Sequence, residues 1–315
     1  MKSGTSVSKK IFPFSLTLLV SLTLMVAISG FAESGVGAKE KNADVSVVYT
    51  QAEAALCFKR PSLLISDYDG TLTPIIKNYQ DAYLTKPQLA TLKRASRLKG
   101  VQLAILSGRA IDQLLPFLKT LRGESILLMG QYGGELYDLK TGQFVFTPDE
   151  HYKTNSRLIK QYLSDKGILT LPNVGIEDKT YTMVLHTSGA TPENAEKAVS
   201  ALEMAMEQNP DIKKDFAAYP GPDRVEILPR DFNKGKGIRD LKPYAAKALG
   251  TDDFNVVFLG DSTGDFPAFE AVNESNGCSI YVKPETSTES PVVTKTVFDI
   301  NSTYGFLKRF AATRP

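Results

Sequence analysis

Short apolar runs alternate along most of the chain with stretches in which apolar residues recur every three or four positions. The runs predict strands that are buried on both faces, and they cover residues 63–65, 101–106, 126–129, 255–259 and 279–282. The periodic stretches predict helices at about 85–99, 110–121, 233–249 and 302–311. Strands that alternate with helices are typical of an α/β fold with a parallel sheet.

Two of the predicted helices carry local signals. Thr85-Lys86-Pro87-Gln88 has the pattern of a capping box with proline in the first turn, which predicts a helix start. Gly100 predicts the end of the same helix. Pro116 lies inside the stretch 110–121 and predicts a kink there, because proline has no backbone N–H to donate.

The pattern changes between residues 149 and 228. Periodic stretches at about 150–166 and 191–208 predict helices. Between and after them, at about 180–187 and 225–228, every second residue is apolar. Alternation of apolar and polar residues predicts strands with one half-exposed face. We therefore expect a small α+β cap at 149–228, inserted into a core that consists of residues 56–148 and 229–315.

The first 32 residues have the three parts of a signal peptide. Lys9 and Lys10 form a basic start, residues 11–28 are apolar, and Gly30-Phe31-Ala32 offers small residues at the cleavage positions. We expect cleavage near Ala32 and export to the periplasm or the medium, with residues 33–55 as a leader. The 18-residue apolar run is also near the lower limit for a membrane span, so a retained N-terminal anchor is the alternative.

The chain of 315 residues is long enough for one large domain or for a domain with an insert. Without the first 32 residues, 34 basic residues stand against 35 acidic ones, and this near-neutral charge argues against a nucleic-acid partner. We expect a monomer that binds a small molecule. A stable membrane partner is expected only if the N-terminal segment is retained.

The two cysteines of the chain are Cys57 and Cys278. In an exported protein they could form a disulfide, and they could equally be buried free thiols. The sequence leaves both possibilities open. The two histidines, His151 and His186, do not form a Cys/His metal motif with them.

Polar residues follow three of the predicted strands at the point where each strand ends: Asp67, Asp69, Ser107, Asp261 and Asp265. Ligands of open α/β sheets bind outside the carboxyl ends of the strands, so these side chains are expected to converge. Asp67 and Asp69 are alternate residues that can face the same spot, and Gly70 allows a sharp turn. Because two carboxylates held so close repel each other, we expect a Mg²⁺ ion between them and a substrate phosphate.

The order and spacing of these motifs resemble the trehalose-6-phosphate phosphatase branch of the haloacid dehalogenase-like hydrolases. The resemblance covers about residues 60–310 and rests on D-x-D-G-T-L-T-P at 67–74, S-G-R at 107–109, G-x-x-G-x-E at 130–135, E-x-K at 177–179, V-E-I-L-P at 225–229, N-K-G-K-G at 233–237 and G-D-x-x-x-D at 260–265. It implies a doubly wound parallel-sheet core with an inserted α+β cap.

The resemblance also implies catalytic roles for four residues. Asp67 would attack phosphorus, and Asp69 would protonate the leaving sugar oxygen and then activate water against the aspartyl phosphate. Ser107 would donate to a phosphate oxygen, although it could also cap the following helix. Lys234 would neutralise the developing charge, which fits the needs of phosphoryl transfer.

Two further sets of residues are implied by the resemblance. Mg²⁺ would be held by Asp67, the backbone carbonyl of Asp69, Asp261 and, directly or in the second layer, Asp265. The expected substrate-binding residues are Arg109, Glu177, Lys179 and Glu226, of which the last three match positions that bind glucose hydroxyls. Arg109 could instead be a structural salt-bridge partner.

We therefore expect a Mg²⁺-dependent phosphatase that converts trehalose 6-phosphate to trehalose and phosphate. The alternatives are an exported phosphatase for another sugar phosphate and a non-catalytic sugar-binding protein on the same fold. Two departures from the family pattern concern the substrate. Ser262 and Phe266 replace acidic residues in the last motif, and Tyr132 stands where the family's G-N-H-G has histidine.

Overall fold

The computed structural model describes residues 48–76 and 78–313. The predicted signal peptide, residues 1–32, and the predicted leader as far as residue 47 lie outside these ranges. Of the remaining leader residues, 51–55 belong to the first described helix, α1 (Gln51–Cys57). Within the described part of the chain, we find no helix with the length and apolar character that a bilayer span requires.

The larger of two sheets in the described residues has eight strands in the order β12-β11-β10-β1-β2-β3-β4-β5. Six strands are parallel: β1 (Ser62–Ser66), β2 (Val101–Leu106), β3 (Ile126–Gly130), β10 (Asn255–Gly260), β11 (Cys278–Val282) and β12 (Lys295–Val297). The antiparallel strands β4 (Glu135–Asp138) and β5 (Gln143–Phe146) extend one edge. The five predicted core strands are confirmed, and β1 lies between β10 and β2 at the centre.

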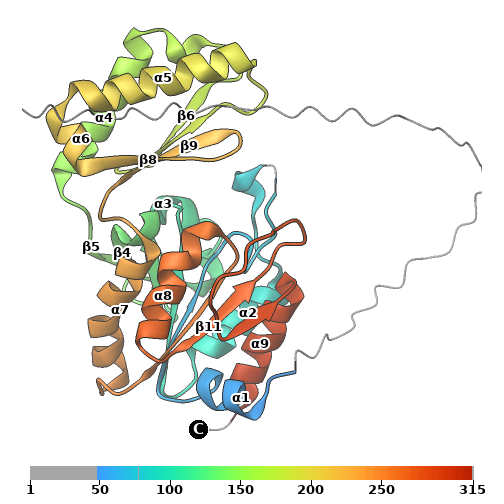
Figure 1. The fold of residues 1–315 in the computed structure, drawn as a ribbon. Coiled ribbons are helices and arrows are strands. Elements are labelled where there is room, and N and C mark those ends of the chain that lie inside the picture. Colours follow the sequence, from blue (N-terminus) through green and yellow to red (C-terminus); the bar gives the residue numbers. More distant parts are fainter. Residues whose placement is uncertain (1–47, 77, 314–315) are drawn as a thin grey trace, which may run out of the picture. The chain divides into compact units, whose positions relative to one another are not determined.

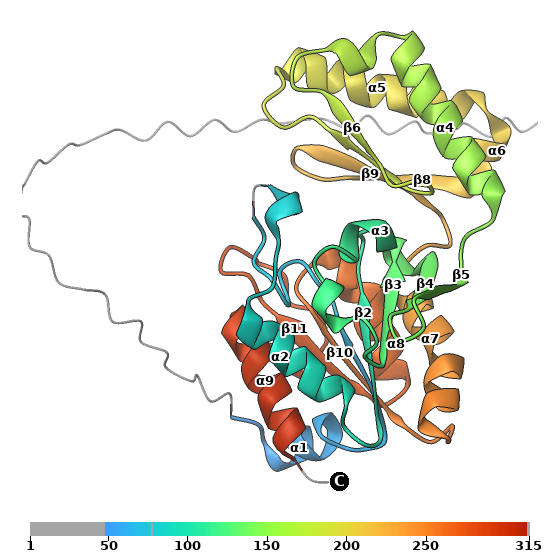
Figure 2. The same ribbon diagram turned by 180° about the vertical axis from the view of Figure 1, so that it is seen from behind.

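Helices cover both faces of this sheet, as Figures 1 and 2 show. Leu64 of β1 belongs to the apolar core under α1, α2 (Lys86–Ser96), α3 (Ile111–Leu114) and α9 (Ile300–Ala312). Its neighbours Leu63 and Ile65 belong to the core under α7 (Lys234–Leu249) and α8 (Phe266–Glu274). Alternate residues of a strand point to opposite faces, so continuous apolar strands are what this arrangement requires. The predicted doubly wound α/β core is confirmed.

The cap has its own sheet and its own apolar core. Its strands are antiparallel in the order β6-β7-β9-β8: β6 (Gly175–Asp178), β7 (Met183–His186), β9 (Arg224–Pro229) and β8 (Phe216–Pro220). One face packs on α4 (Glu150–Asp165), α5 (Pro192–Gln208) and α6 (Pro210–Asp215), which Figure 1 shows together on one side of the small sheet. The predicted α+β cap is confirmed.

Five short 3-10 helices complete the described elements: η1 (Tyr79–Asp81), η2 (Lys119–Leu121), η3 (Gln131–Gly133), η4 (Ile168–Thr170) and η5 (Thr263–Asp265). The predicted helix at 110–121 is wrong, because α3 ends at Leu114 and η2 begins only at Lys119. Pro116 lies in the gap and has no N–H to continue the helix. The capping box is confirmed: Thr85 Oγ1 accepts from Gln88 N–H, and Gln88 Oε1 accepts from Thr85 N–H.

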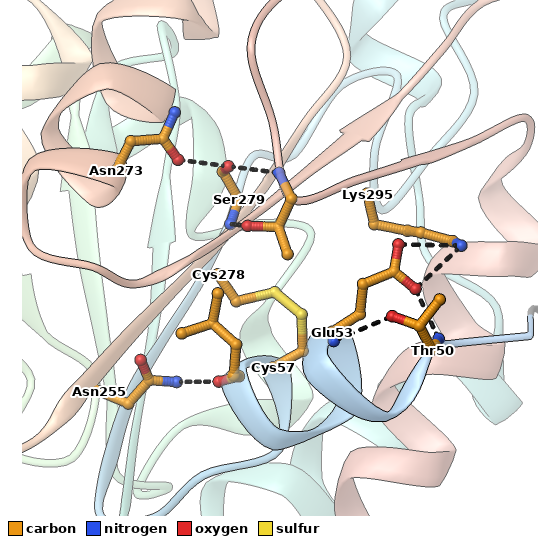
Figure 3. The surroundings of a disulfide bond; sticks show 10 residues. Thr50, Glu53, Cys57, Asn255, Asn273, Cys278, Ser279 and Lys295 are labelled. Atoms are coloured by element: carbon orange, nitrogen blue, oxygen red, sulfur yellow. Dashed lines mark hydrogen bonds and ion pairs between the residues drawn. A yellow bond between two sulfur atoms is a disulfide. The ribbon is translucent and has the colours of Figure 1, made fainter.

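A disulfide joins Cys57 of α1 to Cys278 of β11, which settles the question that the sequence left open (Figure 3). Two polar contacts fasten the same helix. Glu53 forms an ion pair of 3.2 Å with Lys295 of β12, and the amide of Asn255 at the start of β10 donates to the carbonyl of residue 56 (2.8 Å). The N-terminal helix is therefore held against three strands of the sheet.

We expect replacement of the disulfide by Cys57→Ser and Cys278→Ser to lower the free energy of unfolding by about 2–4 kcal/mol, because the unfolded chain loses a long closed loop. Urea unfolding of wild type and variant, each with and without reductant, measures this. The reductant is expected to destabilise wild type and to leave the double variant unchanged. A wild type that is insensitive to reductant would contradict the role of the bond.

Candidate active site

The turn after β1 brings two strand ends together. Asp67 N–H donates to the carbonyl of Leu259 on β10 (2.8 Å), so the pairing of the two strands continues into the site. Gly70 follows with a φ of +81°, and a Cβ atom there would lie 2.0 Å from Asp261 Oδ2. Only glycine tolerates both the left-handed backbone and this close approach. The turn therefore places Asp261 directly against the D-x-D-G segment.

Three buried carboxylates, those of Asp67, Asp261 and Asp265, gather at these strand ends, with ligand atoms within 4.8 Å of one another. The ammonium group of Lys234, also buried, lies 2.9 Å from Asp67 Oδ1 and 2.6 Å from Asp265 Oδ1. Burial raises the pKa of Asp67 well above its ordinary value. Burial, and next the nearby Asp265, raises the pKa of Asp261 to about 7. The cluster is thus short of positive charge, and its oxygen donors fit a hard divalent cation.

Asp265 differs from the other two acids, because both of its oxygens already accept hydrogen bonds. Its Oδ2 accepts from Asp261 N–H (3.0 Å) and from the N–H and hydroxyl of Ser262 (both 2.9 Å). Its Oδ1 accepts from Lys234. A direct bond from Asp265 to a metal would displace one of these donors, so the geometry favours a supporting position. The carboxylate oxygens of Asp67 and Asp261, which line the cavity, are the ones left to bind a metal ion.

Asp69 lies apart from the buried cluster and forms a two-pronged ion pair with Arg109. Arg109 Nε and Nη2 each lie 2.6 Å from an oxygen of Asp69, and Nη2 also donates to the carbonyl of Tyr79 (2.9 Å). The arginine side chain is 7% exposed and packs against the ring of Phe117, whereas Asp69 is 37% exposed. Such a fork fixes the orientation of a carboxylate. The structure shows the expected salt bridge of Arg109. Arg109 also lines the cavity, and its expected role in substrate binding stays a prediction.

Ser107 lies at the end of β2, and its N–H donates to the carbonyl of Met129 (2.9 Å). It does not cap the next helix: α3 is capped at Ala110, whose N–H donates to the side chain of Gln113. Ser107 Oγ instead accepts from Arg109 N–H (3.2 Å). Its hydroxyl proton can then point toward the cavity that the residue lines.

Two of the predicted sugar-binding residues come from β6 and the turn that follows it. Lys179 Nζ donates to the carbonyl of Gly108 in the core (3.2 Å) and lies 3.9 Å from Glu177. Glu177 accepts from the amide of Gln113 (2.9 Å) and lies 3.2 Å from His186 Nε2. Burial opposes ionisation of Glu177, but the contacts with His186, Lys179 and Gln113 lower its pKa to about 2. It is therefore an ionised acceptor at neutral pH.

The third, Glu226 of β9, accepts a hydrogen bond from the hydroxyl of Tyr132. Its other oxygen lies 3.6 Å from Arg224 Nε. Tyr132 belongs to η3 in the core, so this contact, like the two above, joins the core and the cap. Polar groups of the cap thus meet the core at the segments that follow β2 and β3.

One cavity of about 740 Å³ receives nearly all of the predicted site residues. Its lining includes Asp67, Asp69, Ser107, Arg109, Glu177, Lys179, Glu226, Lys234 and Asp261. Asp265 lies behind it, fully buried. The core contributes acids, an ammonium group and a hydroxyl, and the cap contributes two carboxylates and a lysine. Such a lining can bind an anion next to a hydroxyl-rich group.

Sequence reasoning missed Gln113 and His186 as contacts of Glu177, and Tyr132 as the contact of Glu226. Gln113 carried no signal beyond being a polar residue just after S-G-R. Tyr132 departs from the family motif, but its bond to a residue 94 positions away leaves no trace in the local sequence.

The model of the trehalose-phosphatase family matches residues 65–301 of the chain. A trehalose-phosphatase of Schizosaccharomyces pombe is 26% identical over 217 residues, which make up 68% of this chain and 26% of that protein. A probable trehalose-phosphate phosphatase 2 of Oryza sativa subsp. japonica is 23% identical over 239 residues, or 69% of this chain and 59% of that one. The chain thus covers less than two thirds of the length of these relatives.

Among solved structures, the trehalose-6-phosphate phosphatase of Aspergillus fumigatus matches with a TM-score of 0.57 and 22% sequence identity. The match covers 80% of this chain and 93% of that one. At this level of identity, the likeness shows a shared fold.

We expect Lys234→Met to lower the free energy of unfolding by about 3–5 kcal/mol in metal-free buffer, because it leaves buried carboxylates without their counter-charge. Urea unfolding followed by circular dichroism measures the change. Lys236→Met changes a half-exposed lysine on the same helix that pairs with Asp240. It is the matched control and is expected within about 0.5 kcal/mol of wild type. Equal stability of both variants would mean that Lys234 does not offset the buried acids.

Proposed function

The chain belongs to the trehalose-phosphatase family, and we propose that it hydrolyses trehalose 6-phosphate to trehalose and phosphate. One observation carries this proposal: a single cavity is lined by the acid–lysine cluster of the core and by the Glu177, Lys179 and Glu226 side chains of the cap. The first group suits a phosphate monoester, and the second suits sugar hydroxyls. A substrate that carries both can fill the cavity.

In the proposed first step, a carboxylate oxygen of Asp67 attacks phosphorus and the bond to the sugar oxygen breaks. Asp69 gives its proton to the leaving oxygen, which departs as the hydroxyl of trehalose. In the second step, Asp69 takes a proton from water, whose oxygen attacks the aspartyl phosphate. Phosphate leaves and the carboxylate of Asp67 is restored. Two displacements replace a harder one.

The surrounding contacts support these roles. Lys234, held by Asp265 at 2.6 Å, lies 2.9 Å from Asp67 and adds positive charge where the phosphoryl group would bind. The fork of Arg109 holds the carboxylate of Asp69 at the cavity, in the ionised form that the second step needs. In the first step, one of these two bonds would have to open so that Asp69 could carry the proton for the leaving oxygen. Ser107 can donate to a phosphate oxygen. Positioning and electrostatics of this kind are the main requirements of phosphoryl transfer.

Mg²⁺ is the proposed cofactor, because the buried oxygen donors suit a hard cation. Asp67 and Asp261 would hold it, with the backbone carbonyl of Asp69 as a further donor and Asp265 in support. When bound, the ion would neutralise charge on the phosphoryl oxygens. The raised pKa values of Asp67 and Asp261 support an added positive charge at this place.

A second candidate is the hydrolysis of another sugar phosphate, and Tyr132 is the observation that favours it. The tyrosine contacts Glu226 at a position where the family motif has histidine, so the sugar end of the cavity differs in chemistry. A non-catalytic sugar-binding role is less favoured, because Asp67, Lys234 and Asp265 form a buried charged cluster that sugar binding alone does not need. That the protein is a monomer stays a prediction.

We also propose that the protein is exported through its N-terminal segment. Residues 1–32 have the signal-peptide pattern, and the Cys57–Cys278 disulfide is of the kind that persists in oxidising compartments.

Asp67→Asn is expected to reduce turnover of trehalose 6-phosphate roughly a thousandfold or more, because the amide cannot form the covalent intermediate. The substitution is nearly isosteric, so the melting temperature should not fall. Phosphate release and thermal melting are measured together, with the exposed Asp252→Asn as the matched control. Turnover of Asp67→Asn within tenfold of wild type would rule out Asp67 as the nucleophile.

Removal of metal with EDTA should abolish phosphate release, and added Mg²⁺ should restore it. Ca²⁺ is expected to substitute poorly, because it prefers more ligands at longer distances. The readout is initial rate against free metal concentration. Full activity in a chelated, metal-free sample would contradict the proposed cofactor.

Mass spectrometry of the protein from its native host should find a chain that begins near residue 33 and is located outside the cytoplasm. Intact Met1 on a membrane-bound protein would favour the anchor instead. A soluble cytoplasmic protein with the complete N-terminus would contradict both.

A further inference from the structure

The segment after β3 has an unusual backbone. Three consecutive residues, Gln131, Tyr132 and Gly133, have positive φ angles of 49°, 59° and 107°. Residues other than glycine rarely adopt this conformation, and each costs roughly 1–3 kcal/mol unless the surroundings hold it. Such local strain is concentrated at functional sites.

The backbone and ring of Tyr132 contact the phosphate side of the cavity. Its N–H donates to the carbonyl of Ser107 (3.0 Å). A Cβ atom on Gly108 would lie 2.6 Å from the Cζ atom of the ring, and one on Gly264 would lie 3.7 Å from Cε1. The ring therefore packs against the S-G-R turn and against the loop that follows Asp261.

The hydroxyl of Tyr132 contacts the sugar side. It donates to Glu226 of β9, and burial together with Glu226 raises the pKa of the phenol, so the proton stays on the tyrosine. Next to it, Gln131 Oε1 accepts from the N–H and the hydroxyl of Thr182 in the cap (both 3.0 Å). The strained segment 131–133 therefore hydrogen-bonds to Ser107 in the core and to Glu226 and Thr182 in the cap.

We propose that Tyr132 is a positioning residue for the sugar. Its ring rests on the turn that holds Ser107, and its hydroxyl fixes the carboxylate of Glu226, so the phosphate-binding and hydroxyl-binding groups are kept at a set separation. A tyrosine side chain has two rotatable bonds and is rigid once packed. This inference rests on the proposed function, since it assigns Glu226 to sugar binding.

Loss of the hydroxyl should therefore act through Glu226. In Tyr132→Phe, the ring and the backbone stay in place while the carboxylate is free to rotate. A sugar hydroxyl must then order Glu226 on binding, so KM for the sugar phosphate rises more than kcat falls. Because the bond involves a charged acceptor, the expected loss in kcat/KM is about tenfold or more.

A double-mutant cycle tests this with wild type, Tyr132→Phe, Glu226→Ala and the combined variant. Values of kcat and KM are measured with trehalose 6-phosphate, and each protein is also melted thermally. The combined variant is expected within about twofold of Glu226→Ala, because Tyr132 has nothing left to position. Tyr244→Phe, on α7 against Phe146, is the matched control and should behave as wild type.

Fully additive losses in the cycle would overturn the proposal, as would a fall in kcat with unchanged KM. Tyr132→His, which keeps a ring donor, is the second variant and should recover part of the affinity lost with phenylalanine. If both variants fail to fold, Tyr132 is a structural residue and the proposal is wrong.

The proposed substrate is tested separately by the wild type. If it releases no phosphate from trehalose 6-phosphate but hydrolyses another sugar phosphate, the substrate assignment fails and the cycle is run with that compound. If it hydrolyses p-nitrophenyl phosphate and no sugar phosphate, the substrate assignment and the inference about Tyr132 both fail.

Discussion

The ammonium group of Lys234 lies between the carboxylates of Asp67 and Asp265, and the arrangement of the site depends on this buried ion pair. Burying several acids together is costly unless opposite charge and hydrogen bonds compensate. The fold provides the charge at the first residue of α7, where the Asn233 side chain accepts from Lys236 N–H and starts the helix. Central parallel strands bring Asp67 and Asp261 to the same edge. The positive charge of Lys234 therefore lies at the same strand ends where the sheet brings the acids together.

The core and the cap contribute different types of side chain to the cavity. Groups that can act on phosphorus come from the strand ends of the core, and groups that suit hydroxyls come from the cap sheet. Hydrogen bonds within the protein join the core and the cap: Glu177 with Gln113, Lys179 with the carbonyl of Gly108, and Glu226 with Tyr132. Because these bonds occupy lone pairs and donors of the cap residues, a sugar bound in the proposed way would have to share or replace them.

Much of the core could be predicted from sequence, because its signals are local. Apolar runs reveal buried strands, and Thr85-Lys86-Pro87-Gln88 reveals a helix start. Convergence of Asp67 with Asp261 follows from the rule that ligands bind at the carboxyl ends of parallel strands. Three short strands at the two ends of the sheet, β4, β5 and β12, could not be predicted. Contacts between residues far apart in the chain could not be predicted either: the pairing of Cys57 with Cys278 and the contact of Tyr132 with Glu226. Pro116 predicts a kink within one helix, whereas the structure has a break between Leu114 and Lys119.

The position of the disulfide shows how stability and chemistry are separated in this fold. Cys278 is the first residue of β11 and Asn255 the first of β10, so the disulfide and the bond from Asn255 to α1 lie at the amino ends of these strands. Asp261 follows the last residue of β10, at the opposite end. A covalent constraint at the amino ends restricts the unfolded chain without touching the groups that would bind phosphate. The carboxyl ends can then hold a charged cluster and a strained tyrosine. Both cost free energy locally, and the rest of the fold must offset that cost.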